Sequence, residues 1–311
     1  MKAVRIHRFG GPEVMAIEDL PVPQPRDDEI LLRVRAASVN PVDYKTRSGQ
    51  YPKVSEDQLP MTLGRDVSGI VERCGANVDS FAPGDEVYAL LQTDHGGFAD
   101  YAIVPAADAA LKPPSLSHVE AAAVPLAALT AWQGLFDYGR LEQGEHVLIH
   151  GGGGGVGHFA IQFAVARGAR VTTTVSTPDI TFARDLGADA VIDYKTQRFD
   201  ELVHDVDLVL DLVAGETQER SWSVLKRGGR LVSALGEPSH EHASRRDPDA
   251  QGIGFLVEPN GAELTAISDW ITDGKVRPCV QATFPLEQAR DAEQRQENEH
   301  VQGKLVLEIA A

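Results

Sequence analysis

Five consecutive glycines, Gly151 to Gly155, are the residues of this chain with the most specific chemical use. With Val156 they form part of the pattern Gly152-x-Gly154-x-x-Gly157. Glycines at this spacing permit a tight turn, let backbone N–H groups approach a pyrophosphate and let a helix pack closely on a sheet. The positive end of a helix that begins after such a loop attracts an anion. The pattern therefore indicates a dinucleotide site, with a flexible glycine linker as the alternative.

The segments around the glycine run predict the elements that such a site needs. His146 to His150 predicts a strand, and Val156 to Arg167 predicts a helix that ends at Gly168. A second strand is expected over Ala169 to Val175, and a second helix over Asp179 to Leu186. Because the glycines lie between a strand and a helix, the dinucleotide site is favoured over the linker.

The end of the second predicted strand indicates which dinucleotide is bound. Enzymes that use NAD usually carry an acidic residue there, which binds the ribose 2′-hydroxyl, and residues 172–177 contain none. The hydroxyls of Ser176 and Thr177 can donate to a 2′-phosphate, so NADPH is favoured over NADH. Asp179 would oppose this preference if it faced the phosphate. We interpret Asp179 as a solvated residue in the first turn of a helix.

Further apolar segments continue the alternation of helix and strand. Val191-Ile192, Leu208 to Val213 and Arg230 to Leu235 predict buried strands. Buried apolar strands that alternate with helices are typical of an α/β fold with a doubly wound parallel sheet.

The chain before this region has a different pattern. From Met1 to Leu116 it consists of short alternating segments separated by proline and glycine, which predicts an all-β domain, a partly open barrel. Strands are expected over Lys2 to Ile6, Glu29 to Ala36, Gly69 to Glu72, Glu86 to Ala89 and Gly97 to Val104. Val119 to Tyr138 is rich in alanine and leucine and predicts a helix that Pro125 breaks.

The C-terminal region predicts a return to the first domain. It contains a helix over Ala262 to Thr272 and a last strand over Lys304 to Ile309. A terminal strand needs a sheet to pair with, and the β-rich first segment is the better candidate. We therefore expect residues 1–117 and 261–311 to form one domain and residues 118–260 to form the dinucleotide-binding domain.

The composition excludes several classes of protein. The chain of 311 residues has 46 acidic and 29 basic side chains, a formal net charge of -17, which disfavours nucleic acid and anionic membranes as partners. No apolar run approaches the roughly 18 residues of a membrane helix. Only Cys74 and Cys279 are present, so we expect no disulfide framework and a cytoplasmic location. A homodimer is expected, because it is the commonest soluble oligomer.

Seven segments in one order resemble a known family. They are Ser38 to Lys45, Leu63 to Gly69, Phe81 to Val87, Gly96 to Tyr101, the glycine loop, Gly187 to Tyr194, and Gly303-Lys304. The chain resembles, nearly end to end, the medium-chain dehydrogenase/reductase superfamily, and within it the zinc-independent quinone oxidoreductases related to zeta-crystallin. The resemblance implies a GroES-like β-barrel domain joined to a Rossmann domain, with the active site in the cleft between them.

The zinc alcohol dehydrogenases of this superfamily differ from the chain at their metal ligands. They carry a cysteine near the position of Asn40, Gly-His-Glu in place of Gly64-Arg65-Asp66, and a four-cysteine lobe. Zinc needs three or four converging ligands, which two isolated cysteines do not supply. The pair His240 and His242 lies in a polar stretch, and we interpret it as solvated. We therefore expect no metal.

The resemblance also implies which residues contact NADPH. They are Asn40, Pro41 and Asp43 at the nicotinamide and its ribose; Thr130, Phe255, Leu256 and Val257 at the carboxamide; Gly152, Gly154, Gly155, Val156 and Gly157 at the pyrophosphate; Ser176, Thr177 and Tyr194 at the 2′-phosphate; Leu235 and Gly236 along the cofactor; and Lys304 near the cleft. Relatives commonly place a lysine four residues after the serine, where this chain has Ile180. One charge-assisted contact to the phosphate is therefore missing.

Hydride transfer to a quinone or an enone needs a hydrogen-bond donor to the acceptor oxygen rather than a nucleophile or a metal. Tyr44 is the candidate donor or proton relay, with a packing role as the alternative. Asn40 is a candidate orienting amide, and Lys45 a candidate electrostatic helper, with a solvated lysine as the alternative. Asp66 and Asp85 lie beside turn glycines, and we interpret them as acceptors of local backbone N–H groups.

The chain is therefore predicted to be an NADPH-dependent oxidoreductase that transfers hydride to a quinone or a related activated carbonyl compound. An enoyl or alkenal double-bond reductase is an alternative, because pocket shape depends on the loops Tyr51 to Pro60 and Thr93 to Gly97. A non-catalytic NADPH-binding sensor or structural protein is an alternative of another class, because fold does not fix function.

Overall fold

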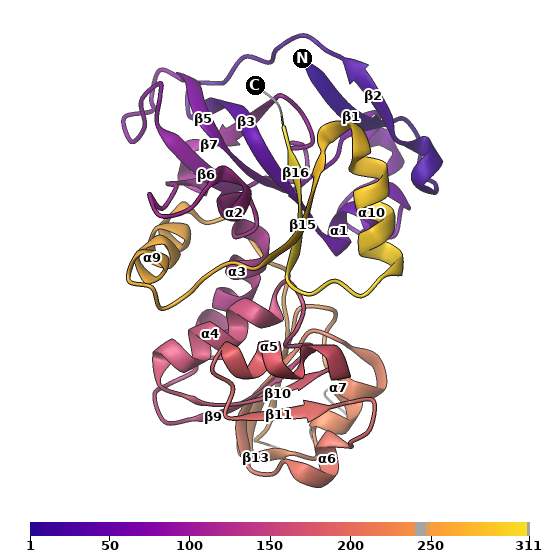
Figure 1. Ribbon diagram of the computed structural model, residues 1–311, viewed down its shortest axis with the longest axis vertical. Coiled ribbons are helices and arrows are strands. Elements are labelled where there is room, and N and C mark those ends of the chain that lie inside the picture. The colour runs from indigo at the N-terminus through magenta and orange to yellow at the C-terminus, as the bar shows by residue number, and fades with distance from the viewer. Residues whose placement is uncertain (240–246, 248, 310–311) are drawn as a thin grey trace. The chain divides into compact units, whose positions relative to one another are not determined.

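The computed structural model describes residues 1–239, 247 and 249–309, so the interpretation of His240 and His242 lies outside the described residues. The chain divides into two compact units, whose elements are labelled in Figure 1. Unit 1 comprises Met1–Leu126, Pro259–Asp273 and Pro278–Ala311. Unit 2 comprises Ala127–Glu258 and Gly274–Arg277.

Unit 1 is mainly β-structure. Its strands are β1 (Lys2–Ile6), β2 (Ala16–Asp19), β3 (Glu29–Val39), β4 (Met61–Thr62), β5 (Asp66–Cys74), β6 (Glu86–Leu90), β7 (Tyr101–Pro105), β8 (Ala109–Leu111), β15 (Val280–Pro285) and β16 (Lys304–Glu308). Its helices are α1 (Pro41–Arg47), α2 (His118–Ala122), α9 (Gly261–Thr272) and α10 (Ala289–Asn298), with short 3-10 helices at Pro12–Val14, Glu56–Gln58, Ala106–Asp108 and Leu286–Gln288.

The main sheet of unit 1 joins the two ends of the chain. Its order is β15-β16-β3-β5-β6-β8, and β7 also pairs with β3. β16 is antiparallel to β3, with Leu305 opposite Val39, and the two strands lie side by side in Figure 1. The predicted pairing of the last strand with the first segment is therefore confirmed. Apolar side chains such as Ile30 and Leu32 pack with Leu305 in one core.

Unit 2 is an α/β unit. Its strands are β9 (His146–His150), β10 (Arg170–Val175), β11 (Ala190–Asp193), β12 (Val206–Asp211), β13 (Leu225–Ser233) and β14 (Gln251–Gly254). Its helices are α3 (Pro125–Trp132), which begins just before the unit, a π-helical turn at Gln133–Tyr138, α4 (Gly157–Arg167), a 3-10 helix at Thr177–Asp179, α5 (Ile180–Asp185), α6 (Phe199–Leu202) and α7 (Gly215–Ser221).

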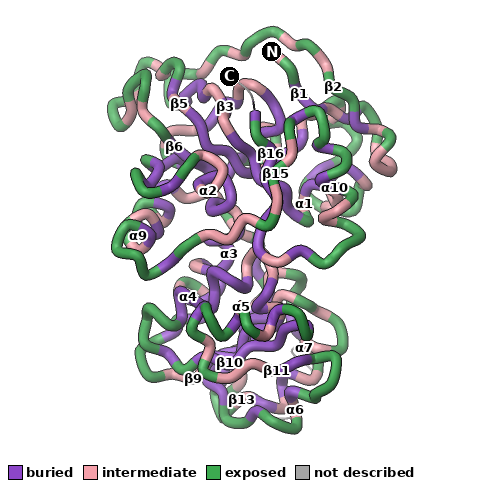
Figure 2. The backbone as a smooth tube through the Cα atoms, in the orientation of Figure 1, coloured by how far each residue is buried: buried purple, intermediate pink, exposed green. Residues whose placement is uncertain are grey.

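All the strands of unit 2 pair in parallel, in the order β11-β10-β9-β12-β13-β14. This is the order of a doubly wound dinucleotide-binding sheet, so the predicted fold class is confirmed. The strands bury apolar side chains such as Leu148, Val209 and Leu231, and Figure 2 shows them as mostly buried tube. Pro125 separates α2 from α3, as the sequence predicted.

Two elements, the strand β14 and the helix α10, are only weakly indicated by the local sequence pattern. β14 has the sequence Gln-Gly-Ile-Gly, which has a low intrinsic preference for a strand, and it exists because it pairs with β13. The helix α10 is almost entirely polar, and Ala289, Ala292 and Glu293 are its buried residues. An apolar stripe of helical period is therefore absent from α10, although the helix packs against α1 and β16 within unit 1.

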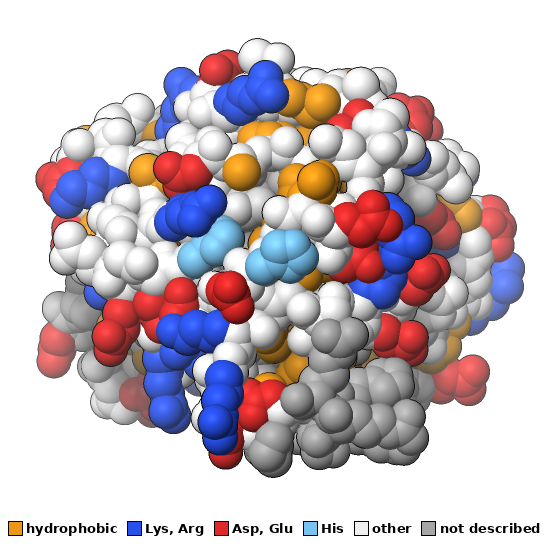
Figure 3. Space-filling model, turned by 90° about the horizontal axis from the view of Figure 1, so that it is seen from below, with side chains coloured by type: hydrophobic (Ala, Val, Ile, Leu, Met, Phe, Trp, Pro, Cys, Tyr) orange, Lys and Arg blue, Asp and Glu red, His pale blue; other side chains and the backbone are white. Residues whose placement is uncertain are grey.

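Acidic and basic side chains lie interspersed on the face shown in Figure 3. Ion pairs of unit 2 such as Arg230–Glu145, at 2.7 Å, and Arg227–Asp249, at 3.2 Å, agree with this mixing. A single-sign basic stripe of the kind that follows a phosphate backbone is not seen on the described residues of that face. Among the described residues, no helix is both long enough and apolar enough to cross a membrane.

The turn after β12 has an unusual backbone. Ala214 has φ 65° and ψ -167°, a region that side chains with a Cβ rarely adopt. The buried Asp211 carboxylate fixes the turn, because it accepts the N–H groups of Val213 at 3.0 Å and Ala214 at 2.9 Å. The same carboxylate accepts the Ser233 hydroxyl at 2.8 Å. Tertiary hydrogen bonds therefore hold a residue in a strained conformation.

Replacing the strained residue with glycine should stabilise the protein. Ala214→Gly is expected to raise the free energy of unfolding by about 1 kcal/mol, because glycine adopts this backbone region without a Cβ clash. Urea denaturation measures the change. Ala266→Gly in α9 is the control and should lower the stability by about 0.5–1 kcal/mol. A loss of stability in Ala214→Gly would contradict the strain argument.

Candidate functional site

The sequence-predicted cofactor residues of unit 2 follow the carboxyl ends of parallel strands. Since the strands are parallel, these ends lie along one edge of the sheet, where ligands bind in doubly wound folds. In sheet order they are Tyr194 after β11, Ser176 and Thr177 after β10, the glycine loop after β9, Leu235 and Gly236 after β13, and Phe255 to Val257 after β14. Thr130 is buried in α3. Most of the cofactor residues predicted from the sequence therefore lie along one edge of the sheet of unit 2.

The glycine loop is shaped by close backbone contacts. The N–H groups of Gly151 and Gly152 both donate to the Thr174 carbonyl at 3.1 Å. A Cβ on Gly152 would lie 2.1 Å from the Thr173 hydroxyl oxygen, and a Cβ on Gly157 would lie 2.1 Å from the Gly151 carbonyl oxygen. No side chain fits at either position, so the glycine spacing is a steric requirement.

The start of α4 offers hydrogen-bond donors to an anion. Within the described chain, the backbone N–H groups of Gly155 and Val156 have no acceptor. A Cβ on Gly154 would meet only the Gly151 carbonyl oxygen, at 3.6 Å, so the outer side of the loop is open. Free N–H groups at the positive end of an eleven-residue helix are suited to a pyrophosphate. The residues present therefore fit a dinucleotide.

The segment after β10 differs from the sequence interpretation. Asp179 is only 1% exposed and accepts the Ser176 hydroxyl at 2.8 Å, so the interpretation of Asp179 as solvated is wrong. The Thr177 hydroxyl donates to Asp193 at 2.7 Å. The 3-10 turn at Pro178 directs the Asp179 side chain back toward the strand end rather than outward. Both hydroxyls thus face a carboxylate in this structure.

A buried histidine supports the same edge. His150 ends β9, and its two ring nitrogens lie 3.0 Å from the Thr174 hydroxyl and 2.9 Å from the Ser221 hydroxyl. Its ring packs edge-on against Phe199, with 4.6 Å between centroids. Burial lowers the pKa of His150 to about 4, which keeps the ring neutral. The ring therefore serves as a neutral link between β9, β10 and α7.

In unit 1 the structure joins Asn40 and Lys304 in one buried network. Asn40 precedes α1, and its amide donates to Asp66 at 2.8 Å and to the Ser38 carbonyl at 3.3 Å. The amide oxygen of Asn40 accepts the Lys304 ammonium, which also lies 3.6 Å from Asp66. The Asn40 N–H donates to Asp43 at 2.7 Å. Pro41 is exposed at the first position of α1.

Asp66 organises this network, and its partners are distant in sequence. It is fully buried and accepts the Ser38 hydroxyl at 2.5 Å and the Leu126 N–H at 2.7 Å. The expectation that Asp66 caps a local turn is therefore wrong, because its partners come from other elements. Asp85 does accept a local N–H, that of Ala82 at 2.8 Å, as expected.

Burial changes the ionisation of two groups in the network. It lowers the pKa of Lys304, and the carboxylates of Asp66 and Asp43 oppose that change. Burial and the nearby Glu293 raise the pKa of Asp43 well above its usual value. Lys304 is thus held near the carboxylate of Asp66, whereas the raised pKa of Asp43 favours its neutral form.

Arg47 and Glu293 anchor α1 and were not found from the sequence. Arg47 is 1% exposed and donates to Glu293 at 2.7 Å, to Glu297 at 2.7 Å and to the Gly10 carbonyl at 2.8 Å. Burial raises the pKa of Glu293 to about 7, and Arg47 opposes that rise. The two residues are 246 positions apart, so no local pattern could have indicated the pair.

The remaining predicted residues on α1 are half-buried. Burial and the charge of Glu297 raise the pKa of Tyr44, which keeps its hydroxyl protonated. The side chain of Lys45 is also half-buried, and its carbonyl accepts the N–H groups of Gln50 and Tyr51. Unlike Asn40, the side chains of Tyr44 and Lys45 form no hydrogen bond to the Asp66 network among the described residues.

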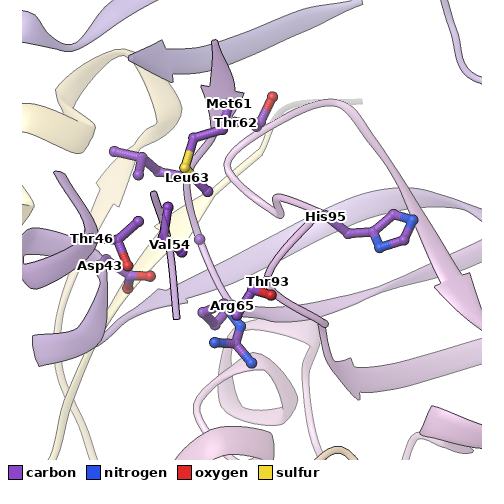
Figure 4. A pocket seen from close by; sticks show the side chains of 10 residues that line it. Asp43, Thr46, Val54, Met61, Thr62, Leu63, Arg65, Thr93 and His95 are labelled. Atoms are coloured by element: carbon purple, nitrogen blue, oxygen red, sulfur yellow. The ribbon is translucent and has the colours of Figure 1, made fainter. Parts of the chain in front are cut away.

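A hollow in unit 1 lies between the two loops that the sequence associates with pocket shape. It is lined by Asp43 and Thr46 of α1, by Val54 of the first loop, and by Thr93 and His95 of the second. In Figure 4 the Asp43, Thr46 and Val54 side chains gather on one side, and the His95 ring points away from them. Both loops therefore reach the same hollow as Asp43.

Comparisons with known proteins cover nearly the whole chain. Residues 26–114 match the family model described as alcohol dehydrogenase GroES-like domain, and residues 186–307 match the model described as zinc-binding dehydrogenase. In the described part of the chain, no group of three or more His, Cys, Asp or Glu is placed to hold a metal.

Three similar proteins illustrate the match. The NADPH-dependent alkenal/one oxidoreductase of Arabidopsis thaliana is 34% identical over 319 residues, which cover 99% of this chain and 79% of that protein. The quinone oxidoreductase structure from Coxiella burnetii is 36% identical, covers 100% of this chain and 99% of its own, and has a TM-score of 0.93. A mycobacterial protein solved with NADPH is 29% identical, covers 99% and 100%, and has a TM-score of 0.88.

The neutral His150 makes stability depend on pH. Its pKa is lowered in the folded state, so the unfolded chain binds a proton first as the pH falls. Between pH 6.5 and 4 this one group should remove about 1.4 kcal/mol of stability per pH unit. Urea midpoints of wild type and His150→Gln at several pH values measure the effect.

The variant should show the flatter dependence on pH in that window. His204→Gln, at an exposed position, is the control and should follow the wild type. Parallel curves for wild type and His150→Gln would show that His150 is not the titrating group.

Proposed function

We propose that this chain, which belongs to the zinc-independent quinone oxidoreductase-like branch of the medium-chain dehydrogenase/reductase family, is an NADPH-dependent reductase of small activated carbonyl compounds. Its acceptor is a quinone or an enone. The observation that carries the proposal is the glycine loop, whose free N–H groups at Gly155 and Val156 stand at the start of α4. The family and the coenzyme of its relatives agree with this loop.

The chemistry belongs to the cofactor, which supplies a hydride to the acceptor when it is bound. The glycine loop would hold the pyrophosphate through the N–H groups of Gly155 and Val156 and the dipole of α4. Tyr194, Leu235 and Phe255 follow strand ends at the same edge and would contact other parts of the cofactor.

The polar residues of unit 1 are proposed to serve the nicotinamide end. Asn40 is fixed through Asp66 and Lys304, so its backbone and the start of α1 are rigidly placed. Tyr44 is our candidate donor to the acceptor oxygen, because a half-buried phenol hydroxyl is protonated at neutral pH and can donate a hydrogen bond. Pro41, Asp43 and Lys45 remain proposed contacts on the same helix.

Two acceptor classes are compatible with this chemistry. The Coxiella burnetii structure is named a quinone oxidoreductase, which favours a quinone. The Arabidopsis thaliana relative is named an alkenal/one oxidoreductase, and a Solanum lycopersicum relative a 2-methylene-furan-3-one reductase, which favours a conjugated enone. Both acceptors develop negative charge on a carbonyl oxygen as hydride arrives, so one hydrogen-bond donor serves either.

We also propose a cytoplasmic homodimer. Neither Cys74 nor Cys279 is in a disulfide, which suits a reducing compartment. A symmetric dimer is the most frequent assembly of soluble oligomers.

The proposal is tested by coenzyme binding and acceptor-dependent oxidation. Wild type should bind NADPH in calorimetry and should oxidise it with either a benzoquinone or an α,β-unsaturated ketone. Gly154→Val should lower NADPH affinity at least about tenfold, because a side chain enters the open side of the loop where the pyrophosphate would lie. Its melting temperature should stay near that of wild type.

Gly157→Ala is the contrasting variant, because its Cβ meets the Gly151 carbonyl and should also lower the melting temperature. Binding of NADPH without oxidation by any acceptor would favour a non-catalytic binding protein instead. Absence of binding to wild type would remove the proposed function.

The role of Tyr44 has its own test. Tyr44→Phe removes the hydroxyl that would donate to the acceptor oxygen, and kcat should fall by about 100-fold with little change in NADPH affinity. Steady-state kinetics with the better acceptor measure the change. Tyr101→Phe in β7 is the control and should leave kcat unchanged. An unaltered kcat in Tyr44→Phe would assign Tyr44 to packing.

A further inference from the structure

We propose that Asp179 reads the 2′ position of the bound dinucleotide and lowers the preference of this chain for NADPH over NADH. The inference rests on the proposed function, because it concerns the coenzyme of the same site. Asp179 follows the carboxyl end of β10, the strand whose end contacts the adenosine ribose in dinucleotide-binding folds.

Asp179 faces the cofactor loop directly. A Cβ placed on Gly153 would lie 2.5 Å from the Asp179 carboxylate oxygen, so the carboxylate stands against the turn of the glycine loop. The same carboxylate accepts the Ser176 hydroxyl at 2.8 Å. One acidic group therefore touches both the glycine loop, which is assigned to the pyrophosphate, and Ser176, which is assigned to the 2′-phosphate.

Asp179 has a local structural role in its bond to Ser176, the residue before the 3-10 helix Thr177–Asp179, but it does not cap α5. An acid that precedes a helix usually accepts the first backbone N–H groups of that helix. Asp179 precedes α5, and its side chain makes no such capping bond. It instead turns inward and is 1% exposed. A buried carboxylate that orients a serine hydroxyl beside a glycine loop is placed to accept ribose hydroxyls.

Charged side chains of both signs lie near the carboxyl ends of β10 and β11. β10 and β11 pair so that Val175 lies opposite Asp193, which brings the residues after both strands together. Asp193 is a second carboxylate there, and it accepts the Thr177 hydroxyl. Lys195 is a cation near Asp193, and its ammonium lies 4.9 Å from the centre of the Tyr194 ring.

Two opposite charges, those of Asp179 and Lys195, therefore act on the group at the 2′ position of the dinucleotide. A 2′-phosphate would be repelled by Asp179 and attracted by Lys195, whereas a 2′-hydroxyl could donate to Asp179. The balance predicts a modest selectivity, with measurable use of NADH. Removing either charged group should move the selectivity in opposite directions.

The experiment compares Asp179→Asn and Lys195→Met with wild type. Calorimetry measures the affinities for NADPH, NADH, adenosine 2′,5′-bisphosphate and AMP, and kinetics measure kcat/KM for both coenzymes. Asp179→Asn should raise the NADPH-to-NADH ratio about tenfold, in affinity and in kcat/KM, because one partly screened repulsion is removed. The bisphosphate-to-AMP affinity ratio should rise with it.

Lys195→Met should lower the same ratios. Asp185→Asn is the matched control, because it removes one negative charge from an exposed position of α5 and should leave all ratios unchanged. Melting temperatures establish that each variant is folded.

The outcomes separate the two proposals. Unchanged ratios in Asp179→Asn, or an equal rise in Asp185→Asn, would overturn the role of Asp179 while leaving the proposed function intact. If wild type binds none of the four probes, the proposed function fails, and the inference about Asp179 fails with it.

Discussion

The close approach of two backbone segments at Gly157 and Gly151 is the constraint on which unit 2 depends. A single added carbon at Gly157 would lie 2.1 Å from the Gly151 carbonyl oxygen. α4 starts close to the end of β9, and the N–H groups of Gly155 and Val156 just before it have no acceptor among the described residues. The anion site is thus a consequence of how tightly one helix packs on one strand.

Unit 1 depends on a different interaction, the burial of charged side chains in mutual contact. Lys304 comes from β16, Asp66 from β5 and Asn40 from the residue before α1. A buried lysine without a partner would be costly, so each strand must hold its place for the network to exist. The same argument applies to Arg47, which links α1 to α10 through Glu293. These pairs make the start of α1 rigid, which is the property that a hydride-transfer site requires of its positioning residues.

The hydrogen bonds of Ser176 and Thr177 in unit 2 bear on the preference between NADPH and NADH. The hydroxyls of Ser176 and Thr177 can donate to a phosphate, and in the structure each donates to a carboxylate. A hydroxyl has one hydrogen to donate, so in the proposed function the binding of a 2′-phosphate would compete with Asp179 and Asp193 for these hydroxyls. The family relation supports NADPH, and the selectivity against NADH that we propose rests on the local charges.

The sequence by itself determined the fold class, the position of the glycine loop and the return of the last strand to the first segment. Each of these depends on local spacing, on apolar period or on an ordered set of motifs, all of which are visible along the chain. The loop residues Gly152 and Gly157 could be assigned because only glycine fits such a turn. Only the tertiary structure decided the partners of Asp66, the Arg47–Glu293 pair and the inward orientation of Asp179. The first two join residues distant in sequence, and the third depends on a turn that directs a polar side chain inward, so one-dimensional patterns of polarity do not encode them.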